Sequence, residues 1–139
     1  MRETPTVTRS TAAPQSGSVR CADQTTLGCE WIVDAKGCSP AALRSLEKLH
    51  ALLGSLVREL TLHPVADPQW HTFPGEAGVT GLCLLAESHF ALHTFPEHGS
   101  LCLNLFCCRQ REDWNFEAYL KEQFEAEEVC VRKLSRRYA

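Results

Sequence analysis

Apolar side chains recur at helical spacing in two parts of the chain. In the first part, leucines repeat every three or four positions from Leu43 to Leu60, with charged residues between them. Ser39 and Pro40 precede this run and are typical of an N-cap followed by a first helical position. In the second part, residues 114–126, aromatic and leucine side chains fall on one side. Both segments are predicted to be helices that lie on a sheet by one apolar face.

Short alternating or β-branched runs predict six strands around these helices. Their ranges are 29–35, 61–65 with an extension over 69–73, 78–86, 90–95, 101–107 and 129–134. Short turns join the third, fourth and fifth strands, which suits an antiparallel sheet, whereas a parallel α/β sheet would need helical crossovers between them. We therefore predict an α+β two-layer sandwich, one antiparallel sheet with two helices on one face, in the order β-α-β-β-β-β-α-β.

The two ends of the chain differ from this patterned region. Residues 1–26 are rich in Thr, Ser, Ala and Pro and contain almost no large apolar side chain. Such a segment cannot bury enough apolar surface to offset its loss of conformational entropy, and we predict that it is disordered. Residues 27–139 then form one domain, which is what a chain of 139 residues can build. Residues 135–139 are predicted to be a basic tail.

Composition and charge exclude several classes of partner. The formal net charge is −3, so we expect no nucleic-acid ligand. No apolar run approaches the roughly 20 residues that cross a membrane, and no signal peptide is recognisable, so a cytoplasmic enzyme without membrane contact is expected. Eight cysteines occur, but none lies in a CxxC pair, which indicates reduced thiols and no structural zinc site.

Polar, reactive side chains interrupt the apolar pattern at one point. A strand-like run ends near Leu85 and is followed by Glu87, Ser88 and His89, an acid, a hydroxyl and an imidazole at a sharp junction. These residues contribute little to a core and are typical of a chemical site. Taken alone, a Ser-His pair in a turn usually belongs to an ordinary turn and has no catalytic role. His89 and His93 share a strand face, but no third metal ligand lies nearby in the sequence, so no metal site is predicted.

An ordered set of short motifs surrounds this junction. Its members are Gly78-Val79-Thr80-Gly81, Glu87-Ser88-His89, His93-Thr94, Pro96-Glu97 and Cys108. In order and spacing, the set resembles the S-adenosylmethionine decarboxylase family in its short prokaryotic form, over about residues 29–136. That family cuts its own chain at a Glu-Ser bond and converts the serine into a covalent pyruvoyl cofactor. The resemblance implies a self-processing, pyruvoyl-dependent decarboxylase that makes the aminopropyl donor for spermidine synthesis.

The resemblance also implies roles for individual residues. The chain would be cut between Glu87 and Ser88, and the pyruvoyl group derived from Ser88 would form a Schiff base with the substrate amine. Thr80 and His93 match the family residues that assist processing, as oxyanion donor and as base for the α-proton of the serine. Cys108 matches the proton donor of the decarboxylation step. By strand alternation, the side chain of Cys107 points to the opposite face.

Substrate contacts and assembly are implied in the same way. Glu97 matches the family carboxylate that holds the ribose hydroxyls, and Phe73 matches an aromatic residue that stacks on adenine. The family pairs two sheets in a dimer and shares residues across the interface. A homodimer of cleaved chains, acting on a small-molecule substrate, is therefore expected.

The sequence departs from the family pattern at several positions near the expected substrate. Phe95 stands where Trp is usual, Asn104 where Asp is usual, Cys107 where Thr is usual, and Glu30 where His is frequent. The stretch from residue 71 to 78 is also one residue longer. These departures leave open a basic amino acid, arginine or ornithine, as the substrate, with Glu30 as partner for its guanidinium or ammonium group.

A third hypothesis is an unprocessed homologue that only binds a ligand or regulates another protein. The presence of Ser88, His93 and Cys108 together is evidence against a non-catalytic homologue, because such a protein has no physical need of all three.

Overall fold

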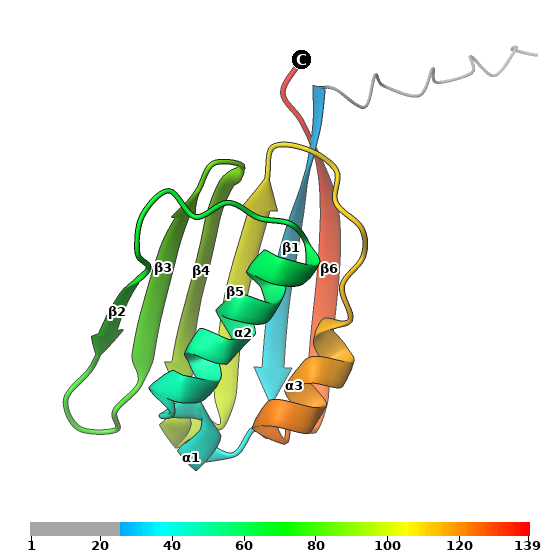
Figure 1. The fold of residues 1–139 in the computed structure, drawn as a ribbon. Helices are drawn as coiled ribbons and strands as arrows, with labels where there is room; N and C mark the ends of the chain where they lie inside the picture. Colours follow the sequence, from blue (N-terminus) through cyan, green and yellow to red (C-terminus); the bar gives the residue numbers. More distant parts are fainter. Residues whose placement is uncertain (1–25) are drawn as a thin grey trace, which may run out of the picture.

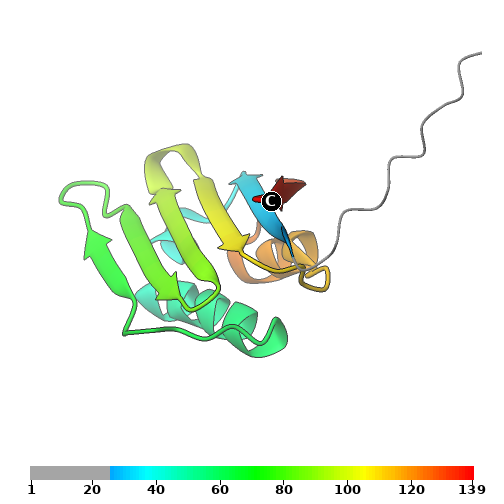
Figure 2. The same ribbon diagram turned by 90° about the horizontal axis from the view of Figure 1, so that it is seen from above.

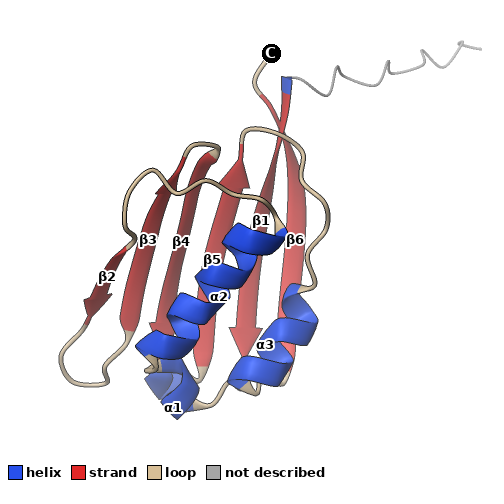
Figure 3. Ribbon diagram, viewed as in Figure 1, coloured by secondary structure: helices blue, strands red, loops and turns tan. Residues whose placement is uncertain are grey.

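The computed structural model describes residues 26–139, and it consists of a single six-stranded antiparallel sheet with helices on one face (Figures 1 and 3). The elements are β1 (Leu27–Lys36), α1 (Pro40–Leu43), α2 (Leu46–Glu59), β2 (Gln69–Thr72), β3 (Val79–Leu85), β4 (Ser88–Phe95), the 3-10 turn η2 (Pro96–His98), β5 (Ser100–Cys107), α3 (Phe116–Phe124) and β6 (Glu128–Arg137). The predicted α+β two-layer architecture is confirmed. The predicted disordered segment, residues 1–26, lies outside the described part of the chain except for Thr26.

The spatial order of the strands differs from their order along the chain. It is β2-β3-β4-β5-β1-β6, so the first strand lies between the fifth and the sixth. Seen from above, α2 and α3 cover one face of the sheet and leave the other face without a covering layer (Figure 2). No helix among residues 26–139 is long and apolar enough to span a membrane.

The predicted first helix is interrupted. The chain forms α1 and then α2, because Ser45 adopts an extended backbone conformation between them. The Ser45 hydroxyl accepts a hydrogen bond from the Lys48 amide at 3.2 Å, an N-cap that contributes about 1 kcal/mol to a helix start. The apolar repeat continues across this break, so the pattern of leucines alone did not reveal it. The second helix, α3, spans Phe116–Phe124 and is shorter than the predicted 114–126.

Two predictions about strands were wrong. Residues 61–65 form no strand, and only an isolated bridge joins Pro64 to Leu85. Proline has no amide hydrogen to donate to a ladder, so the β-branched neighbours of Pro64 could not extend the pairing. The second strand is β2, at the position predicted for the extension. Most of the predicted basic tail belongs to β6, which continues to Arg137 and pairs with β1 over its whole length.

The core lies between the helices and the covered face of the sheet. Alternate residues of β1, β3, β4 and β5 are buried there against the apolar side of α2. The leucines of that side are Leu49, Leu52, Leu53 and Leu56. Thr94 is a fully buried polar residue, and its hydroxyl donates to the Leu43 carbonyl at 3.0 Å and accepts from the Val79 amide at 2.9 Å. It thereby joins α1 to the sheet.

The two glycines of the Gly-Val-Thr-Gly motif permit close approaches to the backbone. A Cβ atom at Gly81 would lie 2.3 Å from the ring of Trp70, which packs over this position from β2. A Cβ atom at Gly78 would lie 2.7 Å from the Thr94 carbonyl oxygen. Neither contact is sterically possible for another residue without rearrangement, which is the physical basis for both glycines of the motif.

The uncovered face, called the open face below, combines polar and apolar side chains. Leu82 and Leu84 of β3 are 49% and 60% exposed, and Leu134 of β6 is 44% exposed. His89 and His93 of β4 lie on the same face, because they alternate with the buried residues of that strand.

Candidate active site

The β3-β4 hairpin contains the proposed cleavage point, and its tip is held by the neighbouring strand. Ser88 begins β4 and pairs with Cys107 at the end of β5. The amide of Cys108 donates a hydrogen bond of 2.7 Å to the carbonyl oxygen of Glu87, the carbonyl of the Glu87-Ser88 bond. Ser88 has a φ of 155°, a positive value that residues other than glycine rarely adopt. The peptide carbonyl is thus polarised at a point of unusual backbone conformation.

The Glu87 carboxylate points away from solvent and is bound by two residues that the sequence motifs did not indicate. His63 donates its backbone N–H to Oε2 at 3.0 Å, and its Nδ1 contacts Oε1. The guanidinium Nη2 of Arg111 lies 3.7 Å from Oε1. Burial alone would raise the pKa of Glu87, but the hydrogen bonds from the His63 side chain and backbone outweigh it and lower that pKa below its ordinary value. Glu87 is therefore a carboxylate at neutral pH.

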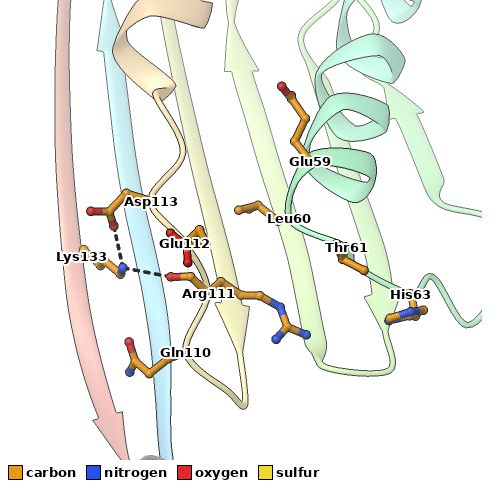
Figure 4. Close-up of a pocket in the computed structure, with 9 residues that line it drawn as sticks. All are labelled: Glu59, Leu60, Thr61, His63, Gln110, Arg111, Glu112, Asp113 and Lys133. Carbon is orange, nitrogen blue, oxygen red and sulfur yellow. Dashed lines mark hydrogen bonds and ion pairs between the residues drawn. The ribbon is translucent and has the colours of Figure 1, made fainter.

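Both partners of this carboxylate, His63 and Arg111, also line a polar cavity of about 660 Å³ (Figure 4). His63 lines one side of it, and Arg111 extends toward His63 from the loop after β5. On the other side, the Lys133 ammonium donates to the Asp113 carboxylate at 2.6 Å and to the Arg111 carbonyl at 3.3 Å. These contacts fix the loop that follows Cys108.

A continuous series of hydrogen bonds runs from Ser88 across the open face. Ser88 Oγ lies 3.2 Å from His89 Nδ1, and His89 Nε2 lies 3.0 Å from Asn104 Oδ1. Asn104 Nδ2 donates to Glu30 Oε1 at 2.6 Å, and Arg136 Nη1 contacts Glu30 Oε2. Burial alone would raise the pKa of Glu30, but its hydrogen bonds with Asn104 and Arg136 lower that pKa below the ordinary value. Arg136 was not recognised from the sequence, because it lay in the supposed tail.

The other predicted site residues gather at the opposite end of β4. Thr80 Oγ1 lies 2.6 Å from His93 Nδ1, directly across the β3-β4 ladder. The His93 ring contacts the rings of Phe73, with centroids 5.5 Å apart, and Phe95, with centroids 4.3 Å apart. Together with Glu97, the residues Phe73, His93 and Phe95 line a cavity of about 300 Å³. Aromatic rings and a carboxylate around one cavity suit a ligand with a planar base and hydroxyl groups.

The two clusters are therefore separate within one protomer. We call the group around Ser88, His89 and Cys108 the cleavage cluster, and the group around Thr80 and His93 the aromatic cluster. Ser88 and His93 are five residues apart on one strand, which corresponds to about 17 Å at the usual rise of a β-strand. The sequence motifs identified both clusters but not their separation.

The adjacent cysteines 107 and 108 have different environments. Cys107 is completely buried on the covered face, opposite Cys29 of β1, as alternation predicted. Its hydrogen bond with Cys29, together with burial, raises the pKa of the Cys107 thiol. Cys108 is only partly buried and follows the end of β5, beside the cleavage point. No disulfide forms among the described cysteines.

Comparison with known proteins agrees with these motifs. The family model for S-adenosylmethionine decarboxylase matches residues 29–137. The S-adenosylmethionine decarboxylase proenzyme of Pyrococcus abyssi is 30% identical over 112 residues, which cover 80% of this chain and 79% of that protein. The proenzyme of Moorella thermoacetica is 30% identical over 118 residues, which cover 79% of this chain and 87% of that protein.

A solved structure shows the same fold. The crystal structure of the adenosylmethionine decarboxylase from Aquifex aeolicus VF5 superposes with a TM-score of 0.66 at 24% identity, covering 82% of this chain and 93% of that chain. With the match of the family model over most of the chain, the motif-based prediction of the family is confirmed. The chain belongs to the S-adenosylmethionine decarboxylase family of pyruvoyl-dependent lyases.

Proposed function

We propose that this protein cleaves its own chain between Glu87 and Ser88, converts Ser88 into a pyruvoyl group and then decarboxylates S-adenosylmethionine to the aminopropyl donor of spermidine synthesis. One observation carries the proposal. The Glu87 carbonyl, which must accept the serine oxygen, already receives a 2.7 Å hydrogen bond from the Cys108 amide. A backbone N–H aimed at a carbonyl oxygen stabilises the negative charge that develops when that carbonyl is attacked.

The residues at this junction fit a pyruvoyl precursor. Ser88 supplies the hydroxyl that attacks the Glu87 carbonyl carbon and rearranges the amide to an ester. Removal of the Ser88 α-proton then eliminates Glu87 as a new C-terminus, and hydrolysis of the remaining dehydroalanine releases ammonia. The elimination needs a base close to Ser88. His93 is the proposed base, and it lies too far along β4 to reach Ser88 of its own chain.

A second copy of the chain resolves this separation. Leu82, Leu84 and Leu134 leave exposed apolar surface on the open face, where the aromatic cluster also lies. If two open faces pack about a two-fold axis near the middle of β4, the partner's His93 comes close to Ser88, and each dimer holds two composite sites. The same arrangement brings Phe73 and Glu97 of one protomer to the cleavage cluster of the other. We therefore propose a homodimer of cleaved chains within the domain 27–139.

In turnover, the pyruvoyl group supplies a carbonyl that bonds to the substrate amine and accepts the electron pair left by departing CO2. Phe73 is proposed to stack on the adenine and Glu97 to accept hydrogen bonds from the ribose hydroxyls. The Cys108 thiol, beside the former Ser88, is proposed to deliver the proton that replaces CO2. Phe73 and Glu97 line the cavity of the aromatic cluster, and Cys108 belongs to the cleavage cluster.

S-adenosylmethionine suits these clusters better than arginine or ornithine. The basic amino acids were considered because Glu30 could pair with a cationic side chain. In the structure, the Glu30 carboxylate is already hydrogen-bonded by Asn104 and by Arg136, a cation of the chain itself. The rings of Phe73 and Phe95 in the aromatic cluster, in contrast, suit a substrate with a ring to stack.

Mass spectrometry of the purified protein tests the proposal. We expect two chains, 1–87 and 88–139, the second lighter than its encoded mass by one ammonia and resistant to Edman degradation. We also expect CO2 release from S-adenosylmethionine and none from arginine or ornithine. A chain that stays intact on long incubation would contradict the self-cleavage. A cleaved protein that decarboxylates only arginine or ornithine would contradict the substrate.

A further inference from the structure

The series of hydrogen bonds from Ser88 to Arg136 determines which nitrogen of His89 carries a proton. Glu30 is ionised, because Asn104 and Arg136 hold its pKa below the ordinary value. A carboxylate only accepts hydrogen bonds, so the Asn104 group at 2.6 Å from it must be the amide NH2. The amide oxygen then faces His89 Nε2 at 3.0 Å, and this oxygen also only accepts. His89 Nε2 therefore carries the proton in the neutral ring.

The other nitrogen, Nδ1, is then unprotonated and lies 3.2 Å from Ser88 Oγ. An imidazole whose free nitrogen faces a serine hydroxyl, and whose N–H is held by a fixed acceptor, is the arrangement that makes serine a nucleophile. From this geometry, and resting on the proposed self-cleavage, we infer that His89 is a catalytic residue of the first processing step. Its Nδ1 takes the hydroxyl proton of Ser88 as Oγ attacks the Glu87 carbonyl carbon.

The atoms of the step balance without an added reactant. The bond from Ser88 Oγ to the Glu87 carbonyl carbon forms while the hydroxyl proton moves to His89 Nδ1. The oxyanion is held by the Cys108 amide. The carbon–nitrogen bond between residues 87 and 88 then breaks, and His89 Nδ1 returns the proton to the departing nitrogen. The products are an ester at Ser88 Oγ and a free Ser88 amine.

His89 and the proposed base His93 therefore serve different steps. His89 moves the hydroxyl proton within its own protomer, whereas the partner's His93 removes the α-proton after the ester has formed. Hydroxylamine separates the two steps, because it cleaves esters but not amides under mild conditions. A His93→Ala chain should stop as the ester and be cut by hydroxylamine. A His89→Gln chain should remain an amide and resist hydroxylamine.

The charged groups that face His89 give a defined pH dependence. Glu30 of β1 and Arg136 of β6 are paired with each other, while Leu84 of β3 and Phe106 of β5 carry no charge. Only the neutral ring can accept the hydroxyl proton. The rate constant of ester formation should therefore rise with pH and level off once the His89 ring is neutral.

The test follows cleavage of the newly synthesised full-length chain, pulse-labelled in cell-free translation and chased at a series of pH values. His89→Gln should lower the rate constant by about 10²- to 10⁴-fold and remove the pH dependence. The slow cleavage of His89→Ala should be accelerated by free imidazole. The matched control is His50→Gln, since His50 lies on α2 against Trp70 and should not affect cleavage.

Asn104 acts only through His89, so it is a positioning residue. Asn104→Ala should slow cleavage by about tenfold in the wild-type background and have no effect in the His89→Gln background, because coupled residues give non-additive changes. The same variants in an uncleavable Ser88→Ala background should melt at similar temperatures, which separates a chemical effect from misfolding.

Several outcomes would overturn the inference. One is cleavage of His89→Gln within about twofold of the wild-type rate, since a general base contributes far more than this. Another is a slow His89→Gln chain that keeps the wild-type pH profile, combined with no effect of imidazole on His89→Ala. In both cases the proposed function still stands if the wild-type protein carries a pyruvoyl group. A wild-type chain that never cleaves would overturn both proposals.

Discussion

The amide nitrogen of Cys108 lies 2.7 Å from the carbonyl oxygen of Glu87, so the backbone after β5 holds the peptide bond proposed to break. The contact comes from the main chain and not from the thiol. A side-chain substitution at Cys108 therefore leaves this hydrogen bond in place, and formation of the pyruvoyl group can be separated from its use.

Cys108→Ala should cleave into two chains and carry a pyruvoyl group, yet turn over poorly. The proposed proton donor is absent, so part of the carbanion should be protonated on the pyruvoyl carbon instead, which converts the cofactor to alanine and inactivates the enzyme. Mass spectrometry of chain 88–139 during turnover measures this conversion. Uncleaved Cys108→Ala protein would show that the thiol takes part in processing.

Cys107→Ala is the matched control, because Cys107 points into the core. It should process and turn over normally and should lose about 1 kcal/mol of stability from the small cavity it creates. Thermal unfolding and CO2 release measure the two effects. Equal loss of turnover in both cysteine variants would show that the assigned proton donor is wrong.

Thr80→Val should slow processing without abolishing folding. Thr80 Oγ1 contacts His93, and the proposed role is to stabilise the oxyanion of the partner's cleavage point. Loss of one such donor costs about 3 kcal/mol of transition-state stabilisation, which corresponds to a rate reduction of about 10²-fold. The rate of chain cleavage in freshly translated Thr80→Val protein, compared with that of the wild type, measures this reduction. Unchanged cleavage in both Thr80→Val and His93→Ala would leave these residues with a structural role only.

Co-expression tests the composite site directly. A Ser88→Ala chain and a His93→Ala chain should each remain uncleaved when made alone. In a mixed dimer, Ser88 of the second chain meets His93 of the first, so the His93→Ala chain should be cut. The tagged chains can be distinguished by mass. Absence of cleavage in isolated mixed dimers would contradict the proposed sharing of residues, and cleavage of His93→Ala alone would remove His93 from the mechanism.

Acid should destabilise the uncleaved chain through Glu87. The pKa of this carboxyl is lowered from its ordinary value of 4.5 in the folded state. Its contribution to stability is therefore complete above pH 4.5 and is lost as the pH falls through the lower, folded-state pKa. In a Ser88→Ala background, urea titrations should show this loss, and Glu87→Gln should remove that part of the pH dependence. Identical pH profiles for the two chains would contradict the pairing of Glu87 with His63 and Arg111.

The sequence predicted the layers and the two clusters but not how the clusters are assembled. Periodicity reports which face of an element is buried, and it therefore identified the helices and five of the six strands in place. It could not predict that the basic residues up to Arg137 pair with β1, because the residues of this edge strand are almost all exposed and their sequence resembles that of a solvated tail. His63 and Arg111 have no motif of their own, and only the fold brings them to Glu87.

The strand order also determines how the two products of the proposed cleavage would be held together. Residues up to Glu87 contribute β1, β2 and β3, and residues from Ser88 contribute β4, β5 and β6. Because β1 lies between β5 and β6, the two products are interleaved: the ladders β3-β4, β1-β5 and β1-β6 all join one product to the other. Scission at the hairpin tip breaks none of these ladders. The fragments should thus remain a single folded unit in native solvent and part only under denaturing conditions, so that the new chain ends gain local freedom while the sheet beneath them stays intact.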